Sequence, residues 1–205
     1  MIQIPFSLFI EFVLSPSHER FAVVKKSRTR GAYGPQKDFY LLLKNEMRRS
    51  VLRNERVNIE RVLGRTDHTA KHDNYPAIAE NFERWRCQKK RDFFVPPEAI
   101  WRSKSVTIKV QPDVAFECQG QRYAGFMHYR KDLEIKKSAA DFLLHVPAEA
   151  FDAKGILGYR YCLIDVRTPK AWNLGNLRPA TSKQLQLEAE SFASMYRELD
   201  ADEAA

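Results

Sequence analysis

Cysteine is scarce in this sequence, and its few residues lie far apart. Cys87, Cys118 and Cys162 are odd in number and form no CxxC pair. Neither a scaffold of disulfide bridges nor a zinc site built from thiolates is expected from three isolated residues. The pattern instead predicts a protein of the reducing cytoplasm.

Long hydrophobic runs are also missing. No stretch approaches the roughly 20 apolar residues that a membrane helix needs, so no membrane partner is expected. The apolar segment 2–14 is interrupted by Pro5 and Glu11 and has no basic region ahead of it. It therefore does not resemble a signal peptide.

The bulk composition predicts a folded protein with an excess of positive charge. Of the 205 residues, 44% are hydrophobic and 12% aromatic, which indicates a globular chain, and we expect one domain over 1–205. The formal net charge is +8 and the pI is about 9.4, which favours an acidic partner such as DNA or RNA. The alternative is an ordinary solvated surface with a modest excess of lysine and arginine.

An N-terminal extension is predicted over residues 1–66. Residues 6–14 and 21–26 are short apolar segments separated by Ser15-Pro16-Ser17-His18, and we interpret them as a hairpin. A helix is predicted over 38–51, with Asp38 as its N-cap, and a second over 57–63.

Lysine and arginine gather in three places that are candidates for phosphate contacts. An exposed run of charge is otherwise only a solvated face. The candidate nucleic-acid-binding residues are Lys25, Lys26, Arg28, Arg30, Arg48, Arg49, Lys89, Lys90 and Arg91.

The rest of the chain predicts an α/β core with a central mixed sheet. An amphipathic helix over 74–87 follows an irregular segment, 64–74. Period-2 alternation over about 105–130 predicts a three-stranded antiparallel meander, with Pro112-Asp113 at its first bend and Gly120 at its second. We then expect a helix over 133–151 that is interrupted at Pro147, a strand over about 159–166, and a helix over 181–199.

The order of elements over 74–199 resembles the PD-(D/E)xK nuclease-like, or restriction-endonuclease-like, superfamily. That family has a core of helix, three strands, helix and strand, with Pro-Asp early in the meander. Pro112-Asp113 supplies this half of the motif. The resemblance implies metal-assisted phosphodiester hydrolysis, in which carboxylates hold Mg²⁺ and a lysine orients the nucleophile.

The second half of the motif is degenerate. The third strand carries no acid before Lys131, and its same-face pairs are His128-x-Arg130 and Tyr129-x-Lys131. The candidate catalytic residues are therefore Asp113, His128, Arg130 and Lys131. The candidate metal ligands are Asp113 and an acid that has migrated to another position: Glu80, Glu83 or Glu117.

Three functions remain open at this point. The first is a nucleic-acid-binding protein on a degenerate nuclease-like scaffold with weak or no catalysis. The second is an active Mg²⁺-dependent nuclease that uses the migrated acid. The third is a protein–protein interaction module, with a protein partner or a second copy of the chain. Its contact residues would be Phe93, Phe94, Trp101 and Trp172, because aromatic residues are favoured at interface centres.

Overall fold

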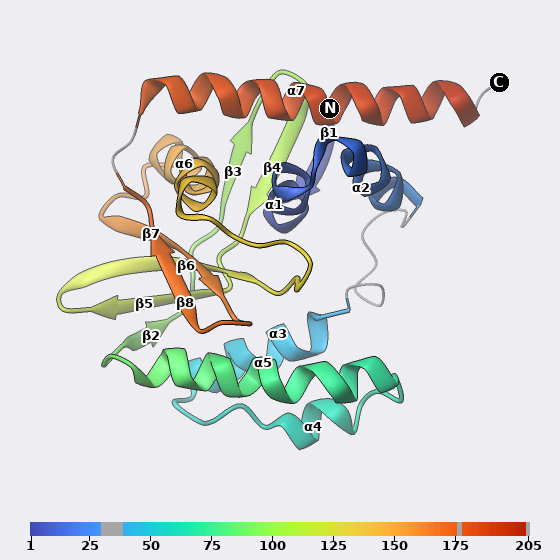
Figure 1. Cartoon of the computed structure of the whole chain (residues 1–205). Coiled ribbons are helices and arrows are strands. Elements are labelled where there is room, and N and C mark those ends of the chain that lie inside the picture. Colours follow the sequence, from blue (N-terminus) through green and yellow to red (C-terminus); the bar gives the residue numbers. More distant parts are fainter. Residues whose placement is uncertain (30–38, 176–177, 204–205) are drawn as a thin grey trace.

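The protein has an α/β architecture with two sheets. The computed structural model describes residues 1–29, 39–175 and 178–203. One sheet has three strands and the other has five, and helices flank both (Figure 1). The α/β class predicted from the sequence is confirmed.

The larger sheet has five strands in the order β2-β5-β6-β7-β8. Only β6 and β7 run parallel, and the other neighbours are antiparallel, so this sheet is mixed as predicted. Gln119 and Gly120 join β5 to β6 with φ angles of 53° and 73°, which a two-residue hairpin turn requires. The strands are β2 Asp92–Phe94, β5 Val114–Cys118, β6 Gln121–His128, β7 Tyr159–Asp165 and β8 Lys170–Asn173.

The smaller sheet contains β1 Ile2–Pro5, β3 Ala99–Arg102 and β4 Val106–Val110. β4 lies in the middle, antiparallel to β3 and parallel to β1. The predicted meander over 105–130 is therefore wrong in its first strand: β4 forms, but in the other sheet. Alternation of side chains identifies a strand and not its neighbours, and the 111–113 link passes between sheets instead of forming a hairpin.

Seven helices occur in the described residues. The longest, α7, has 25 residues, but within the described part of the chain no helix combines the length and apolar composition needed to cross a membrane. The helices are α1 Phe6–Leu14, α2 Ser17–Thr29, α3 Leu41–Leu52, α4 Ile59–Leu63, α5 Thr69–Cys87, α6 Lys137–Ala153 and α7 Pro179–Glu203.

The first two helices replace the predicted N-terminal hairpin, which is wrong. In α1 the buried residues include Phe6, Phe9 and Ile10, whose spacing of three and four places them on one helical face. The second predicted strand lies within α2. A short apolar run fits a buried helix as well as a strand, so periodicity alone does not separate the two.

The remaining helices lie near their predicted positions, with two differences. α5 begins at Thr69, so part of the segment expected to be irregular is helical. α6 continues through Pro147, where an interruption was predicted. Pro147 is buried beside Val146 and Ala148, and we attribute the continuous helix to this packing, which offsets the backbone hydrogen bond that proline removes. Asp38, the predicted N-cap, lies outside the described residues.

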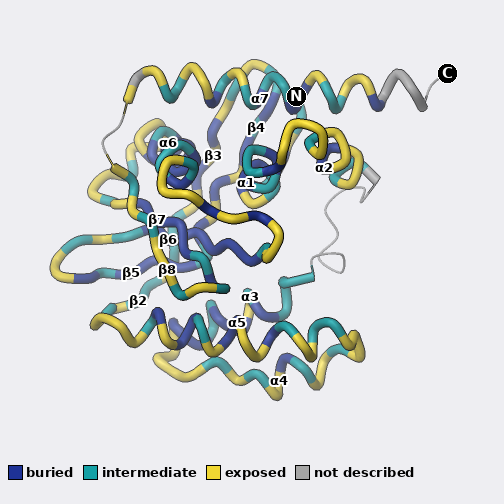
Figure 2. The backbone as a smooth tube through the Cα atoms, viewed as in Figure 1, coloured by how far each residue is buried: buried dark blue, intermediate teal, exposed yellow. Residues whose placement is uncertain are grey.

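The five-stranded sheet separates two hydrophobic cores. Phe116, Met127 and Ile164 face α3, α4 and α5, which form one helical layer. Phe126 and Leu163 point to the opposite face, where α6 and the smaller sheet with α1, α2 and α7 complete the second core. Figure 2 shows the central strands largely buried, while exposed residues line the outer sides of α4, α5 and α7.

Candidate functional site

The Pro112-Asp113 corner joins the two sheets. It follows β4 and precedes β5, and the Asp113 amide donates to the Gly125 carbonyl at 2.9 Å, which holds the corner against β6. Pro112 is buried. The corner is therefore anchored to the larger sheet through its backbone.

Both oxygens of the Asp113 carboxylate are occupied by groups of the protein itself. Oδ2 accepts a hydrogen bond from the Met127 amide at 2.8 Å, and Oδ1 pairs with the Arg48 guanidinium at 3.3 Å. Arg48 also donates to the carbonyls of Pro112 and Asp113, at 3.3 and 3.2 Å. A cation from α3 thus lies where the resemblance implies a metal ion.

The other three catalytic candidates do not join Asp113 in one polar cluster. His128 is buried, with Nε2 2.8 Å from the Leu133 carbonyl, and burial lowers the pKa of its imidazole. Arg130 pairs with Glu11 of α1 and with Asp132. The hydrogen bond from Arg130 lowers the pKa of Asp132 to about 2. Lys131 is exposed.

The three further metal-ligand candidates have different surroundings. Glu80 is exposed and pairs with Arg84 at 2.5 Å. Glu83 accepts from the Val57 amide at 2.9 Å and pairs with Arg86 at 3.2 Å. Among the described residues, no group of three or more histidine, cysteine, aspartate or glutamate side chains could hold a metal ion.

Glu117 lies on a different part of the surface. It is the direct cross-strand partner of Asp92 and lines an open pocket of about 470 Å³ with Lys89 and Lys90. Those two lysines lie close to the two carboxylates, so the pocket wall carries both signs of charge. The pocket does not include Asp113.

Some of the predicted phosphate-binding cations contact groups of the protein itself. Arg48 holds Asp113, and Arg49 pairs with Glu46 and Glu55 at 2.7 and 2.8 Å. The Arg91 guanidinium lies over the Trp85 ring, 4.3 Å from its centroid, and donates to the Trp85 carbonyl at 2.6 Å.

The remaining candidates are distributed over both ends of the molecule. Lys25 and Lys26 are exposed on α2, and Arg28 lies over the Tyr196 ring at 5.9 Å. Lys89 and Lys90 are exposed after the end of α5. Arg30 lies outside the described residues.

Positive charge is concentrated in the α3–α5 layer. Residues 39–91 contain 13 lysines and arginines and 7 aspartates and glutamates, a net charge of +6 out of the +8 of the whole chain. This layer forms one outer side of the molecule, opposite α7 (Figure 1). The electrostatic asymmetry therefore coincides with a structural layer.

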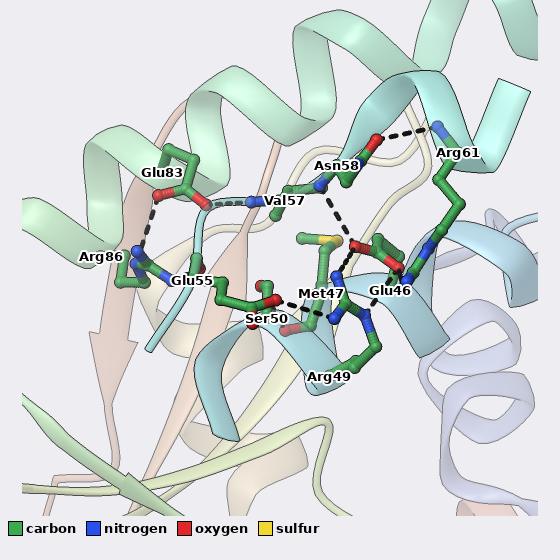
Figure 3. Close-up of polar contacts among 10 residues, drawn as sticks. All are labelled: Glu46, Met47, Arg49, Ser50, Glu55, Val57, Asn58, Arg61, Glu83 and Arg86. Carbon is green, nitrogen blue, oxygen red and sulfur yellow. Dashed lines mark hydrogen bonds and ion pairs between the residues drawn. The ribbon is translucent and has the colours of Figure 1, made fainter. Parts of the chain in front are cut away.

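Within this layer, a buried carboxylate network holds the loop between α3 and α4 (Figure 3). Glu46 is only 5% exposed and binds Arg49, Arg61 and the Asn58 amide. Burial opposes ionisation of Glu46, but the hydrogen bonds from these three groups outweigh it and lower its pKa. Glu83 accepts a hydrogen bond from the preceding amide, that of Val57.

The backbone of the same loop is held at both ends. Asn54 ends α3 with a φ of 52°, and the amides of Asn54 and Glu55 donate to the carbonyls of Val51 and Ser50 at 3.2 and 2.8 Å. This pair of bonds is a Schellman motif. At the other end, the Asn58 side chain caps α4 by accepting from the Arg61 amide at 2.9 Å.

The loop was missed by sequence reasoning, although it carried one usable signal. Asn58 followed by Glu60 and Arg61 is typical of a helix start. The acids that hold the loop are distant in the sequence: Glu46 lies 12 residues from Asn58, and Glu83 lies 26 residues from Val57. What the network leaves at the surface is Arg53 and Arg56, both exposed. Among the described residues neither makes an ion pair with an acid.

The aromatic residues proposed for a protein interface are covered to a large extent. Trp101 is 3% exposed and its indole nitrogen donates to Glu149 at 2.7 Å. Phe93, Phe94 and Trp172 are half-buried. These side chains contribute mainly to the packing of the sheets.

A scan against known protein families found no match, and a search of curated protein sequences found none either.

Proposed function

We propose that this protein binds nucleic acid through its α3–α5 layer, on a nuclease-like scaffold that does not cleave. The observation that carries the proposal is the net charge of +6 on residues 39–91, gathered in one layer of the fold. A dense cationic surface of this kind attracts phosphate backbones and releases their counterions.

The order of elements in the larger sheet supports the nuclease-like scaffold. Along the chain, α5 is followed by β2, then by β3 and β4 of the smaller sheet, and then by β5, β6, α6 and β7. β2, β5 and β6 are neighbouring antiparallel strands, and β7 returns parallel to β6. This is helix, three strands, helix and strand, with β3 and β4 inserted before Pro112-Asp113.

The lack of cleavage is proposed from the chemistry at Asp113. Holding Mg²⁺ beside a phosphodiester takes at least two anionic ligands. Asp113 is one anion, and Arg48 and the Met127 amide already occupy its two oxygens. A dication would have to displace a guanidinium from this corner, and an active nuclease with a migrated acid would need that rearrangement.

A salt titration of binding tests the proposal. We expect the chain to bind an oligonucleotide at about 50 mM salt and to lose affinity steeply toward about 200 mM, with little dependence on sequence. No binding at low salt would refute nucleic-acid binding and favour a protein partner. The cytoplasm, which the three free cysteines support, is the compartment in which we place this activity.

A cleavage assay tests the second half of the proposal. Wild type and Asp113→Ala are incubated with plasmid and with Mg²⁺ or Mn²⁺. We expect neither to cut. Degradation by wild type that is lost in Asp113→Ala would make Asp113 catalytic and the chain a nuclease.

A further inference from the structure

We infer that the α3–α4 loop and α4, residues 53–65, form the face that contacts phosphates, and that its ligand is a duplex. This inference rests on the proposed function and assigns it to one surface. The face carries four exposed arginines, of which Arg61 pairs with Glu46. The other three are Arg53, Arg56 and Arg65.

These arginines differ from five other arginines of the layer, Arg61 among them, which pair with acids within the described residues. Arg48, Arg49 and Arg86 are tied to acids, and Arg84 pairs with Glu80. No ion pair of Arg53, Arg56 or Arg65 occurs within the described part of the chain. Their guanidinium groups therefore need not give up an internal partner to bind a phosphate.

The acids on the same face reduce its charge only in part. Arg49 neutralises Glu55 at 2.8 Å, and Glu60 is exposed on α4. α4 has five residues and is about 7.5 Å long. Arg53 and Arg56 precede it in the chain and Arg65 follows it, so the unpaired cations flank a short, exposed helix.

Hydrogen bonds hold the backbone of the loop in the absence of a ligand. The amides of Val57 and Asn58 are held by the buried Glu83 and Glu46, and the Glu55 carbonyl accepts from Arg86 at 2.5 Å (Figure 3). A surface whose backbone is already fixed pays less conformational entropy on binding. The two buried acids are therefore positioning residues for the arginines.

The choice of duplex over single strand comes from the aromatic residues. Residues 53–65 contain none, and among the described phenylalanines, tyrosines and tryptophans only Phe21 is exposed, on α2. Proteins that hold single strands without sequence preference stack bases on aromatic rings. This surface offers charge without such a platform, so it recognises the regular phosphate spacing of a duplex.

The test replaces the three arginines by glutamine and measures binding to a 20-base-pair duplex by fluorescence anisotropy. If all three contact phosphates, the slope of log K against log salt falls by about 2 to 3, and affinity at about 0.1 M salt falls by at least tenfold. Replacement of the same arginines by lysine keeps the charge and should keep the slope.

The matched control removes the same charge elsewhere. Lys104, Lys170 and Lys183 are exposed and lie outside residues 39–91. Their triple glutamine variant should bind nearly as wild type does. An equal loss of affinity in both triple variants would overturn the inference, because net charge and not this face would then decide binding.

A second variant tests the positioning role by the direction in which it changes binding affinity. Glu83→Ala removes a negative charge, so net charge alone predicts tighter binding; a loosened loop predicts weaker binding. We expect weaker binding, with the fold checked by circular dichroism. Unchanged or tighter binding by a folded Glu83→Ala would refute the positioning role.

Three further outcomes separate this inference from the proposed function. If wild type binds the duplex and the arginine-to-glutamine variant binds equally well, the function stands and this face is wrong. If wild type binds a single strand of equal length more tightly, or binds anionic vesicles but no duplex, the duplex assignment is wrong. If wild type binds no nucleic acid at all, the proposed function itself fails.

Discussion

Replacement of Asp113 by alanine should destabilise the fold without affecting any metal chemistry. The carboxylate accepts the Met127 amide at 2.8 Å and pairs with Arg48 at 3.3 Å. Met127 is 5% exposed, so in Asp113→Ala its N–H loses an acceptor where water has little access.

The two lost interactions set the size of the effect. An unsatisfied buried amide costs about 1–3 kcal/mol. The Arg48 side chain is 30% exposed and that of Asp113 16%, so their ion pair adds about 0–1 kcal/mol. We therefore expect the free energy of unfolding to fall by about 1–4 kcal/mol. Asp113→Asn keeps an oxygen for the Met127 amide and should lose no more than about 1 kcal/mol.

Urea unfolding of wild type, Asp113→Ala and Asp113→Asn measures the difference. A double-mutant cycle with Arg48→Met then isolates the coupling, which we expect to lie at about 0.5–1 kcal/mol. If Asp113→Ala unfolds at the same urea concentration as wild type, Asp113 does not hold the corner. Its carboxylate would then have to be explained by function.

Three further predictions concern packing, pH and thiols. Gly125→Ala should cost about 1–3 kcal/mol in urea unfolding, because its Cβ would lie 2.9 Å from both Ile164 Cδ1 and Val114 Cγ2; wild-type stability would show that the sheet adapts freely. Burial lowers the pKa of His128 and of His145, and the charged groups near His145 are Asp141, Glu149 and Arg178. As the pH falls, these histidines therefore bind protons at a higher pH in the unfolded chain than in the folded protein. The free energy of unfolding should therefore fall as the pH drops below about 6.5, and it should fall less in His128→Gln than in wild type. A His128→Gln variant with the same pH profile as wild type would contradict this. Burial raises the pKa of Cys162 to about 12, so a thiol reagent should modify exposed Cys87 in the native protein and Cys162 only on unfolding; rapid native labelling of Cys162 would refute this.

The sequence predicted the positions of strands and helices better than it predicted which elements pair with one another. The alternation of Val106, Ile108 and Val110 places a strand correctly, but the partner of that strand is β1, more than 100 positions earlier. Nothing local in the 106–110 segment specifies this pairing. Segment 6–14 was assigned to the wrong type because its apolar residues satisfy both a helix and a buried strand.

The candidate site was predicted in its residues and not in its contacts. Pro112-Asp113 does lie at a corner of the sheet, yet the cation beside it comes from α3, 65 positions away. Arg130, which the sequence places near Asp113, turns to Glu11 on α1. Charge composition predicted a basic protein, but only the fold shows the charge gathered in one layer and the network of Glu46 and Glu83 behind it.

The parallel pairing of β1 with β4 has a consequence during synthesis on the ribosome. Ile2 pairs with Val106, so at about 5–20 residues per second β1 and the apolar α1 emerge several seconds before their partners exist. The α3–α5 layer, in contrast, is continuous in the chain over 41–87. During this interval the nascent chain exposes an unpaired strand and an apolar helix. We therefore expect residues 2–14 to bind a chaperone that captures apolar segments.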